Sequence, residues 1–138
     1  MAESPPLPDL GEVLRRLSDG VMERDGVMRV ALLGALAGEN ELLLGPPGTA
    51  KSLVARRLAG VFADAHYFQY LLTRFTSPDE LFGPVSLRQL KERDEFARKL
   101  EGYLPTAEVA FIDEIFKASS AILNSLLTLI NERLYFNG

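Results

Sequence analysis

Residues suited to binding a polyphosphate gather in one octapeptide, Gly45-Pro46-Pro47-Gly48-Thr49-Ala50-Lys51-Ser52. It follows the apolar run 42–44 and opens a helix-compatible stretch, 53–59. A strand, a glycine-bearing turn and a helix in this order form the context of a phosphate-binding loop, whose backbone N–H groups and helix N-terminus converge on the phosphates. We therefore predict that nucleotide phosphates bind at Gly45, Pro46, Pro47, Gly48, Thr49, Ala50, Lys51, Ser52 and Leu53. Lys51 would reach the terminal phosphates, and the Ser52 hydroxyl would ligate Mg²⁺.

Ala50 departs from the strict pattern of such loops, which has a second glycine at this position. Alanine carries a Cβ atom, and this atom restricts the backbone conformations that the residue adopts readily. We therefore expect Ala50 to have ordinary helical or extended dihedral angles.

Two adjacent carboxylates, Asp113 and Glu114, end the apolar run 109–112. Such a run is typical of a buried parallel strand, and ligands of open α/β sheets bind at the carboxyl ends of strands. We expect Asp113 to hold Mg²⁺, directly or through water, and Glu114 to orient or deprotonate an attacking water. Phosphoryl transfer requires mainly positioning and charge neutralisation, so Lys51 and Glu114 are the predicted catalytic residues. Without a ligand, the same residues would be a plain helix start and a solvated strand end.

Alternating helices and strands are predicted to position these residues. Apolar residues at helical spacing predict helices over 10–21, 25–37, 51–63 and 120–133, with Asp9 and Asp25 as N-caps of the first two and Gly38 as a C-cap. The run 76–80 predicts the start of a short helix that Gly83-Pro84 ends. Apolar or aromatic runs predict strands over 41–44, 67–71, 109–114 and 134–136, and Asn137-Gly138 is a favoured hairpin-turn dipeptide. The charge-rich residues 85–99 are either a peripheral helix or a mobile insertion.

Composition sets outer limits on the fold and function. The chain has 138 residues and 15.2 kDa, which suffices for one ordinary domain, and its 47% hydrophobic and 25% charged residues are those of a globular protein. We expect a disordered lead-in over 1–8 and a domain over 9–138. No run approaches the roughly 18 to 20 apolar residues that cross a bilayer, and the N-terminus lacks the pattern of a secretory signal. The absence of cysteine excludes disulfides and thiolate metal sites and fits the cytoplasm.

Binding of nucleic acid or of a metal at histidines is disfavoured by the same composition. The net charge of −4 argues against a dedicated nucleic-acid binder. His66 is the single histidine of the chain, so no histidine-based metal cluster can form, and we expect it on the surface or at a strand edge.

The octapeptide also resembles the Walker A motif of the MoxR family of AAA+ ATPases, in which alanine before the lysine is usual. Further stretches are similar to the RavA subgroup of that family. They are 70–75, 80–84, 102–105, 112–118, 121–127, 130–133 and 137–138. Together they cover nearly the whole chain from Asp9 onward.

This resemblance implies an αβα P-loop NTPase (AAA+) core with a parallel sheet in the strand order 5-1-4-3-2. Strands 1 to 3 lie in this chain, and strands 4 and 5, the helical lid, the sensor residues and the arginine finger would follow Gly138. The chain is thus expected to be the N-terminal part of an AAA+ domain, ending within the pre-sensor-1 hairpin that begins at Leu134, with the helix-2 insertion in 85–107.

The resemblance also implies ATP and Mg²⁺ as ligands, Asp113 as the Walker B acid and Glu114 as the residue that activates water. The complete protein would be a homo-hexameric ATPase that remodels or assembles partner proteins, and a von Willebrand factor A domain protein is the expected partner. Two alternatives remain at this point. One is a nucleotide-binding switch without turnover, and the other is a DNA-directed or chelatase-type AAA+ motor.

Overall fold

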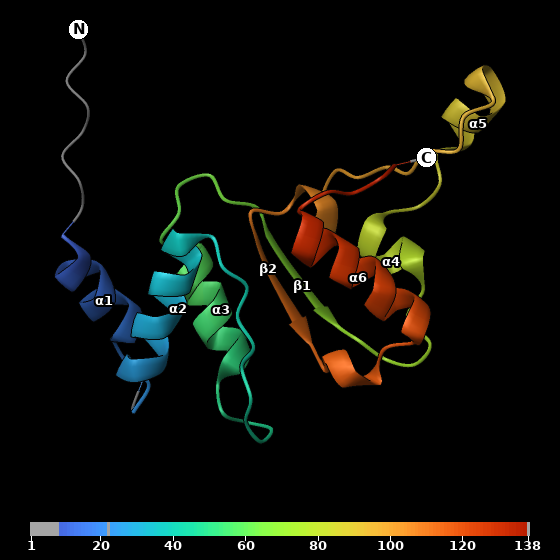
Figure 1. Cartoon of the computed structure of the whole chain (residues 1–138). Helices are drawn as coiled ribbons and strands as arrows, with labels where there is room; N and C mark the ends of the chain where they lie inside the picture. Colours follow the sequence, from blue (N-terminus) through green and yellow to red (C-terminus); the bar gives the residue numbers. More distant parts are fainter. Residues whose placement is uncertain (1–8, 22, 138) are drawn as a thin grey trace, which may run out of the picture. The chain divides into compact units, whose positions relative to one another are not determined.

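The computed structural model describes residues 9–21 and 23–137, and the chain divides into two compact units, 1–63 and 64–138. Helices alternate with two parallel strands, so the predicted α/β class is confirmed (Figure 1). The lead-in predicted over 1–8 and the second residue of the predicted turn, Gly138, lie outside the described residues. Within the described part, no helix is both long and apolar enough to cross a membrane.

The first unit contains α1 (Leu10–Ser18), α2 (Asp25–Ala37) and α3 (Lys51–Ala59). The helices bury a shared core formed by Leu17, Met28, Ala31, Leu32, Val54 and Leu58. Asp9 caps α1 as predicted, since its Oδ1 accepts a hydrogen bond from the Gly11 N–H at 2.9 Å. The prediction for Asp25 was wrong, because Asp25 is the first helical residue and follows Arg24, which makes no side-chain cap.

In the first unit, α2 ends where it was predicted to end, whereas α1 and α3 end earlier. Gly38 ends α2 in the left-handed conformation, with φ 70°, as predicted. The helix α3 stops at Ala59, ahead of the predicted end. Beyond it the hydrogen bonds join residues three apart, from the Val61 N–H to the Leu58 carbonyl at 3.0 Å and from the Phe62 N–H to the Ala59 carbonyl at 3.2 Å. Residues 61–63 therefore continue the chain as turns.

The segment 41–44, predicted to be a strand, is not one in the structure. Leu43 packs against the helical core, whereas Leu42 and Leu44 are exposed. This alternation is that of an extended chain. A strand also requires ladder hydrogen bonds with a neighbour, and in the described part of the chain no segment pairs with 41–44.

The second unit is built on two parallel strands, β1 (Tyr67–Leu71) and β2 (Val109–Asp113). Tyr67 pairs with Val109 and Leu71 with Asp113, which makes the predicted second and third strands direct neighbours. The helices α4 (Pro78–Phe82) and α6 (Ser120–Glu132) pack with the sheet around one hydrophobic cluster. Its buried members are Leu72, Leu81, Phe82, Leu104, Ile122 and Leu126.

The start of α4 follows the predicted pattern closely. The Glu80 carboxylate accepts a hydrogen bond from the Ser77 N–H at 2.7 Å, and the Ser77 side chain caps the helix in return. This backbone donor holds the pKa of Glu80 below its ordinary value. Gly83 ends α4, and its N–H donates to the Asp79 carbonyl at 3.1 Å.

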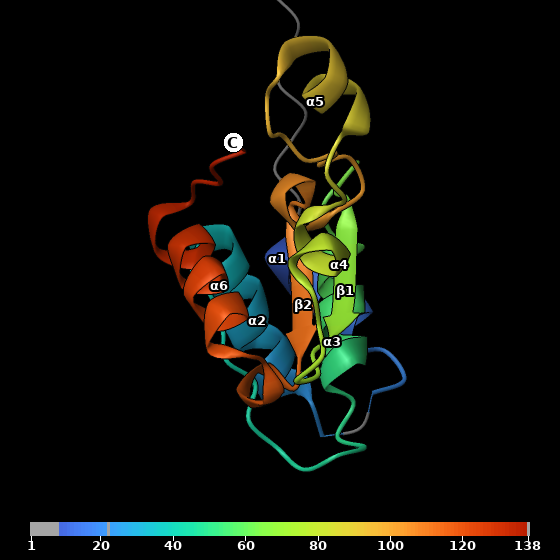
Figure 2. The ribbon, with the colours of Figure 1, turned by 90° about the vertical axis from the view of Figure 1, so that its right-hand side faces the viewer.

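Residues 84–99 form an arm that carries α5 (Leu87–Arg93). Its two ends run antiparallel, with the Ser86 N–H bonded to the Ala97 carbonyl at 2.8 Å and the Lys99 N–H to the Pro84 carbonyl at 2.9 Å. Within the second unit, α5 stands away from β1, β2 and α6 in both views (Figures 1 and 2). Of the two predictions for this region, the peripheral helix is therefore the one that holds.

The predicted strand over 134–136 is also absent, because the segment lacks a ladder partner among the described residues. Its side chains nevertheless bind it to the rest of the unit. The Tyr135 ring stacks on Phe82 with the ring centres 5.2 Å apart. The Asn137 amide forms two hydrogen bonds with the backbone of Arg98, accepting from its N–H at 2.6 Å and donating to its carbonyl at 3.1 Å.

Candidate functional site

The predicted phosphate loop is an exposed turn that leads directly into α3. Gly48 has φ +79°, a conformation that favours glycine, and a Cβ atom placed there would meet nothing within 4 Å. The Thr49 hydroxyl donates to the Pro46 carbonyl at 2.8 Å, which closes the turn on itself. A hydrogen bond within the loop thus fixes its conformation, and the space next to Gly48 is open.

Lys51, the first residue of α3, folds back over this loop. Its Nζ atom donates to the Gly45 carbonyl at 2.9 Å and to the Pro46 carbonyl at 3.1 Å. In the described part of the chain, the ammonium group forms no ion pair with a carboxylate. Its charge is therefore satisfied only by neutral carbonyls, so an anion in the loop would be a stronger partner.

Ala50 contradicts the conformation that its side chain led us to expect. It is the N-cap of α3 and has φ 58° and ψ 24°, which is the left-handed region. Left-handed backbone costs a residue with a Cβ atom about 1–2 kcal/mol, so the rest of the loop must impose this conformation. Ala50 therefore holds a backbone conformation that glycine would adopt without strain.

Ala50→Gly is expected to raise the free energy of unfolding by about 1 kcal/mol, because glycine adopts positive φ without strain. Chemical denaturation followed by circular dichroism measures this change. Ala121→Gly serves as the control, because Ala121 lies on the exposed face of α6 with helical geometry. The control is expected to lose about 0.5–1 kcal/mol. A loss of stability in Ala50→Gly would contradict the strain argument.

Asp113 is the last residue of β2 and is half-buried. Its backbone carbonyl accepts from the Leu72 N–H at 2.9 Å, which continues the parallel ladder beyond β1. Its Oδ1 atom accepts from the Glu114 N–H at 2.9 Å. The ladder fixes the backbone of Asp113, and this short contact orients the carboxylate at the end of the strand.

Glu114 follows in the left-handed conformation, with φ 56° and ψ 40°, and its side chain is exposed. It caps the short 3₁₀ turn η2 (Ile115–Lys117), whose last N–H donates to the Glu114 carbonyl at 2.8 Å. The Lys117 Nζ lies 3.4 Å from the Glu114 carboxylate. Sequence analysis did not predict this ion pair, although the three-residue spacing in a helical turn is the signal that would have indicated it.

Six non-glycine residues have positive φ in the described part of the chain, and two of them are Ala50 and Glu114. Strained backbone of this kind concentrates at functional sites, where surrounding contacts hold it in place. The other four, Glu23, Asp64, Asp94 and Arg133, are not among the predicted site residues, so positive φ by itself does not single out a site. The structure groups Gly45, Pro46, Thr49 and Lys51 in the first unit, and Asp113, Glu114 and Lys117 in the second.

The residues fit Mg²⁺ bound together with phosphates better than a metal held by protein alone. Within 9–21 and 23–137, no group of three histidine, aspartate or glutamate side chains could hold a metal ion. Mg²⁺ commonly uses one or two carboxylates and takes the remaining ligands from water and substrate phosphates. Asp113 offers a carboxylate of this kind in the second unit, and Ser52 offers a hydroxyl in the first.

Comparison with known proteins places this chain among AAA+ proteins. It belongs to the MoxR family, since residues 8–138 match the MoxR domain in the MoxR-vWA-beta-propeller ternary systems. Two uncharacterized proteins of Methanocaldococcus jannaschii are each 51% identical over 129 residues, covering 94% of this chain and 34% of their own length. The ATP-dependent zinc metalloprotease FtsH of Ureaplasma parvum is 37% identical over 93 residues, covering 67% of this chain and 12% of that protein. The chain thus spans about a third of the length of the archaeal relatives.

Proposed function

We propose that this chain supplies the nucleotide-binding half of an ATPase and that the complete protein hydrolyses ATP with Mg²⁺. The observation that carries the proposal is the loop before α3. There Lys51 lies over the carbonyls of Gly45 and Pro46, and Ala50 holds the left-handed backbone of a glycine. Membership of the MoxR family and the similarity to an ATP-dependent protein support it.

In this proposal the loop N–H groups and Lys51 bind the nucleotide's phosphates, because they present positive charge at the start of α3. Ser52 and Asp113 hold Mg²⁺, which when bound neutralises charge on the phosphates. Glu114 accepts a hydrogen bond or a proton from the attacking water. To bind this water, Glu114 must break its ion pair with Lys117. This costs little free energy, because both side chains are exposed and such ion pairs are weak.

We further propose that the complete protein works as a homo-hexamer on partner proteins, and that its partner carries a von Willebrand factor A domain. The proposed partner is supported by the matching family, which is described by its MoxR-vWA-beta-propeller ternary systems. The homo-hexamer rests on the resemblance to AAA+ ATPases. The finer assignment to the RavA subgroup rests on the sequence stretches that resemble it.

A second candidate function is a nucleotide-binding switch without turnover. The Glu114–Lys117 ion pair favours it, because a carboxylate that keeps this partner is less available to a water molecule. In both the switch and the ATPase the loop binds the phosphates of the nucleotide. Only in the ATPase does Glu114 activate a water molecule. Binding and turnover must therefore be measured separately.

Lys51→Ala is expected to weaken binding of a fluorescent ATP analogue about tenfold to a hundredfold, because it removes a charged hydrogen-bond donor to phosphate. Fluorescence titration measures the affinity. Lys91→Ala is the matched control, since Lys91 is an exposed lysine on α5 that is not in the loop. Equal affinity of the wild type and Lys51→Ala would overturn the proposed nucleotide site.

A further inference from the structure

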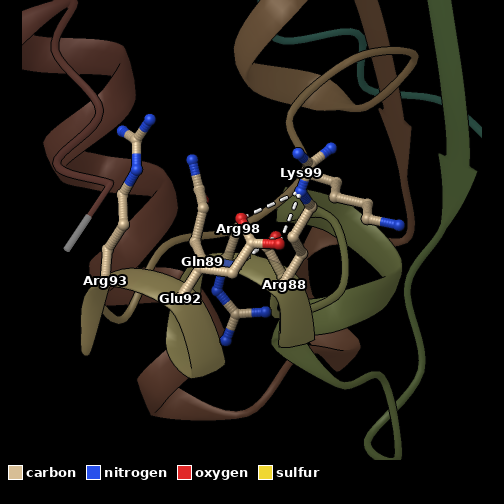
Figure 3. A pocket seen from close by; sticks show the side chains of 7 residues that line it. Arg88, Gln89, Glu92, Arg93, Arg98 and Lys99 are labelled. Atoms are coloured by element: carbon tan, nitrogen blue, oxygen red, sulfur yellow. Dashed lines mark hydrogen bonds and ion pairs between the residues drawn. The ribbon is translucent and has the colours of Figure 1, made fainter.

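The arm that carries α5 borders a shallow polar cavity that is open to solvent, shown in Figure 3. The cavity has a volume of about 410 Å³ and lies between α5 and the end of the arm at Arg98 and Lys99. Its lining residues are Ser86, Arg88, Gln89, Glu92, Arg93, Arg98 and Lys99. Four of these seven side chains are cationic and one is acidic, in a chain whose net charge is −4.

Two of the four cations already have acidic partners. Arg88 Nε lies 3.1 Å from the Glu92 carboxylate, and Arg98 pairs with Asp79. Within the described residues, the side chains of Arg93 and Lys99 form no ion pair. The cavity lining therefore includes two positive charges that no acidic side chain of residues 9–21 and 23–137 pairs with.

The base of the cavity is held rigidly by Arg98. Its guanidinium donates to the Gly83 carbonyl at 2.7 Å in addition to pairing with Asp79, and its side chain is 16% exposed. The Asn137 amide binds the backbone N–H and carbonyl of the same residue. A site whose base is fixed before binding loses less conformational entropy when a ligand arrives.

Apolar side chains border the charged cavity along the arm. Leu87, Leu90 and Phe96 are exposed, and α5 has no buried residue. A seven-residue helix gains little stability by itself, and exposed apolar side chains next to charged ones are typical of a protein interface. The arm is thus suited to a partner that supplies both apolar contacts and negative charge.

We propose that this arm binds an acidic, leucine-bearing segment of a protein partner, with carboxylates of the partner at Arg93 and Lys99. A polyanion such as nucleic acid fits less well, because its affinity comes from many phosphate contacts along a basic surface. Among the described residues, the cavity lining offers two cations without an ion pair, Arg93 and Lys99, and the chain as a whole is acidic. This interaction uses residues other than those of the nucleotide site, so it does not depend on the proposed ATPase function.

The test uses a fluorescein-labelled peptide of alternating glutamate and leucine and measures its binding to the chain by fluorescence anisotropy. The double variant Arg93→Glu/Lys99→Glu is expected to weaken binding about tenfold or more, because two attractions become repulsions. Lys91→Glu is the matched control, because it reverses a cation on α5 that does not line the cavity. The control is expected to stay within about twofold of the wild type.

Two further probes separate the kinds of partner. A peptide of alternating glutamine and leucine is expected not to bind, since it lacks carboxylates, and a single-stranded oligothymidylate is expected to compete weakly. The proposal is overturned if the acidic peptide fails to bind, if Lys91→Glu weakens binding as much as the double variant, or if the oligothymidylate displaces the peptide efficiently. Circular dichroism of each variant shows whether the fold is kept, so a loss of binding in a folded variant supports the proposal.

Discussion

Glu114→Gln is expected to slow ATP hydrolysis by the full-length protein about 10²–10⁴-fold while ATP stays bound, because the amide cannot accept a proton from water. Glutamine keeps the size of the side chain and the left-handed backbone at this position. The loop residues that hold the phosphates are unchanged. Turnover is measured as phosphate release, and binding is measured by titration with a fluorescent ATP analogue.

The control for Glu114→Gln is Glu132→Gln, which removes an exposed carboxylate at the end of α6. It is expected to hydrolyse ATP at the wild-type rate. Loss of the Glu114–Lys117 pair is expected to have little effect on stability, because both side chains are exposed to solvent and such pairs are weak. Hydrolysis by Glu114→Gln at the wild-type rate would contradict the role proposed for Glu114. If the wild-type protein binds ATP without turnover, the switch is the better description.

Local patterns predicted those elements whose contacts lie within the same stretch of sequence. The strand β1 has the predicted bounds because its aromatic run is bounded by polar residues. The start of α4 is correct because the Ser77 and Glu80 side chains satisfy backbone groups three residues away. The segments 41–44 and 134–136 have equally apolar sequences but are not strands. A strand depends on hydrogen bonds to a neighbour, and the sequence of the segment itself does not specify that neighbour.

At the candidate site, the positions of the elements were predicted better than the backbone conformation. The types and spacing at Lys51 and Asp113 indicated phosphate and Mg²⁺ chemistry, and both residues begin or end an element as expected. The left-handed backbone at Ala50 could not be predicted, because alanine rarely adopts it and only the surrounding loop imposes it. The contact between Asn137 and Arg98 joins residues far apart in the sequence, and no local pattern indicates such a pairing.

Gly83→Ala is expected to destabilise the second unit by about 3 kcal/mol or more, since it combines backbone strain with overpacking. Gly83 is buried and has φ +88°. A Cβ atom there would lie 1.9 Å from the Lys99 carbonyl oxygen. That carbonyl belongs to the backbone at the base of the arm. It cannot move aside without disturbing the antiparallel pairing of the two ends of the arm. Chemical denaturation monitored by circular dichroism measures the loss.

Gly102→Ala separates the two causes of this loss. Gly102 has φ +80°, close to the value at Gly83, but a Cβ atom there would meet nothing within 4 Å. Its substitution therefore adds the backbone strain alone and is expected to cost about 1 kcal/mol. A loss in Gly83→Ala no larger than that in Gly102→Ala would mean that the arm yields to the added methyl group. That result would contradict the claim that the base of the cavity is rigid, because the same backbone carries Arg98 and Lys99.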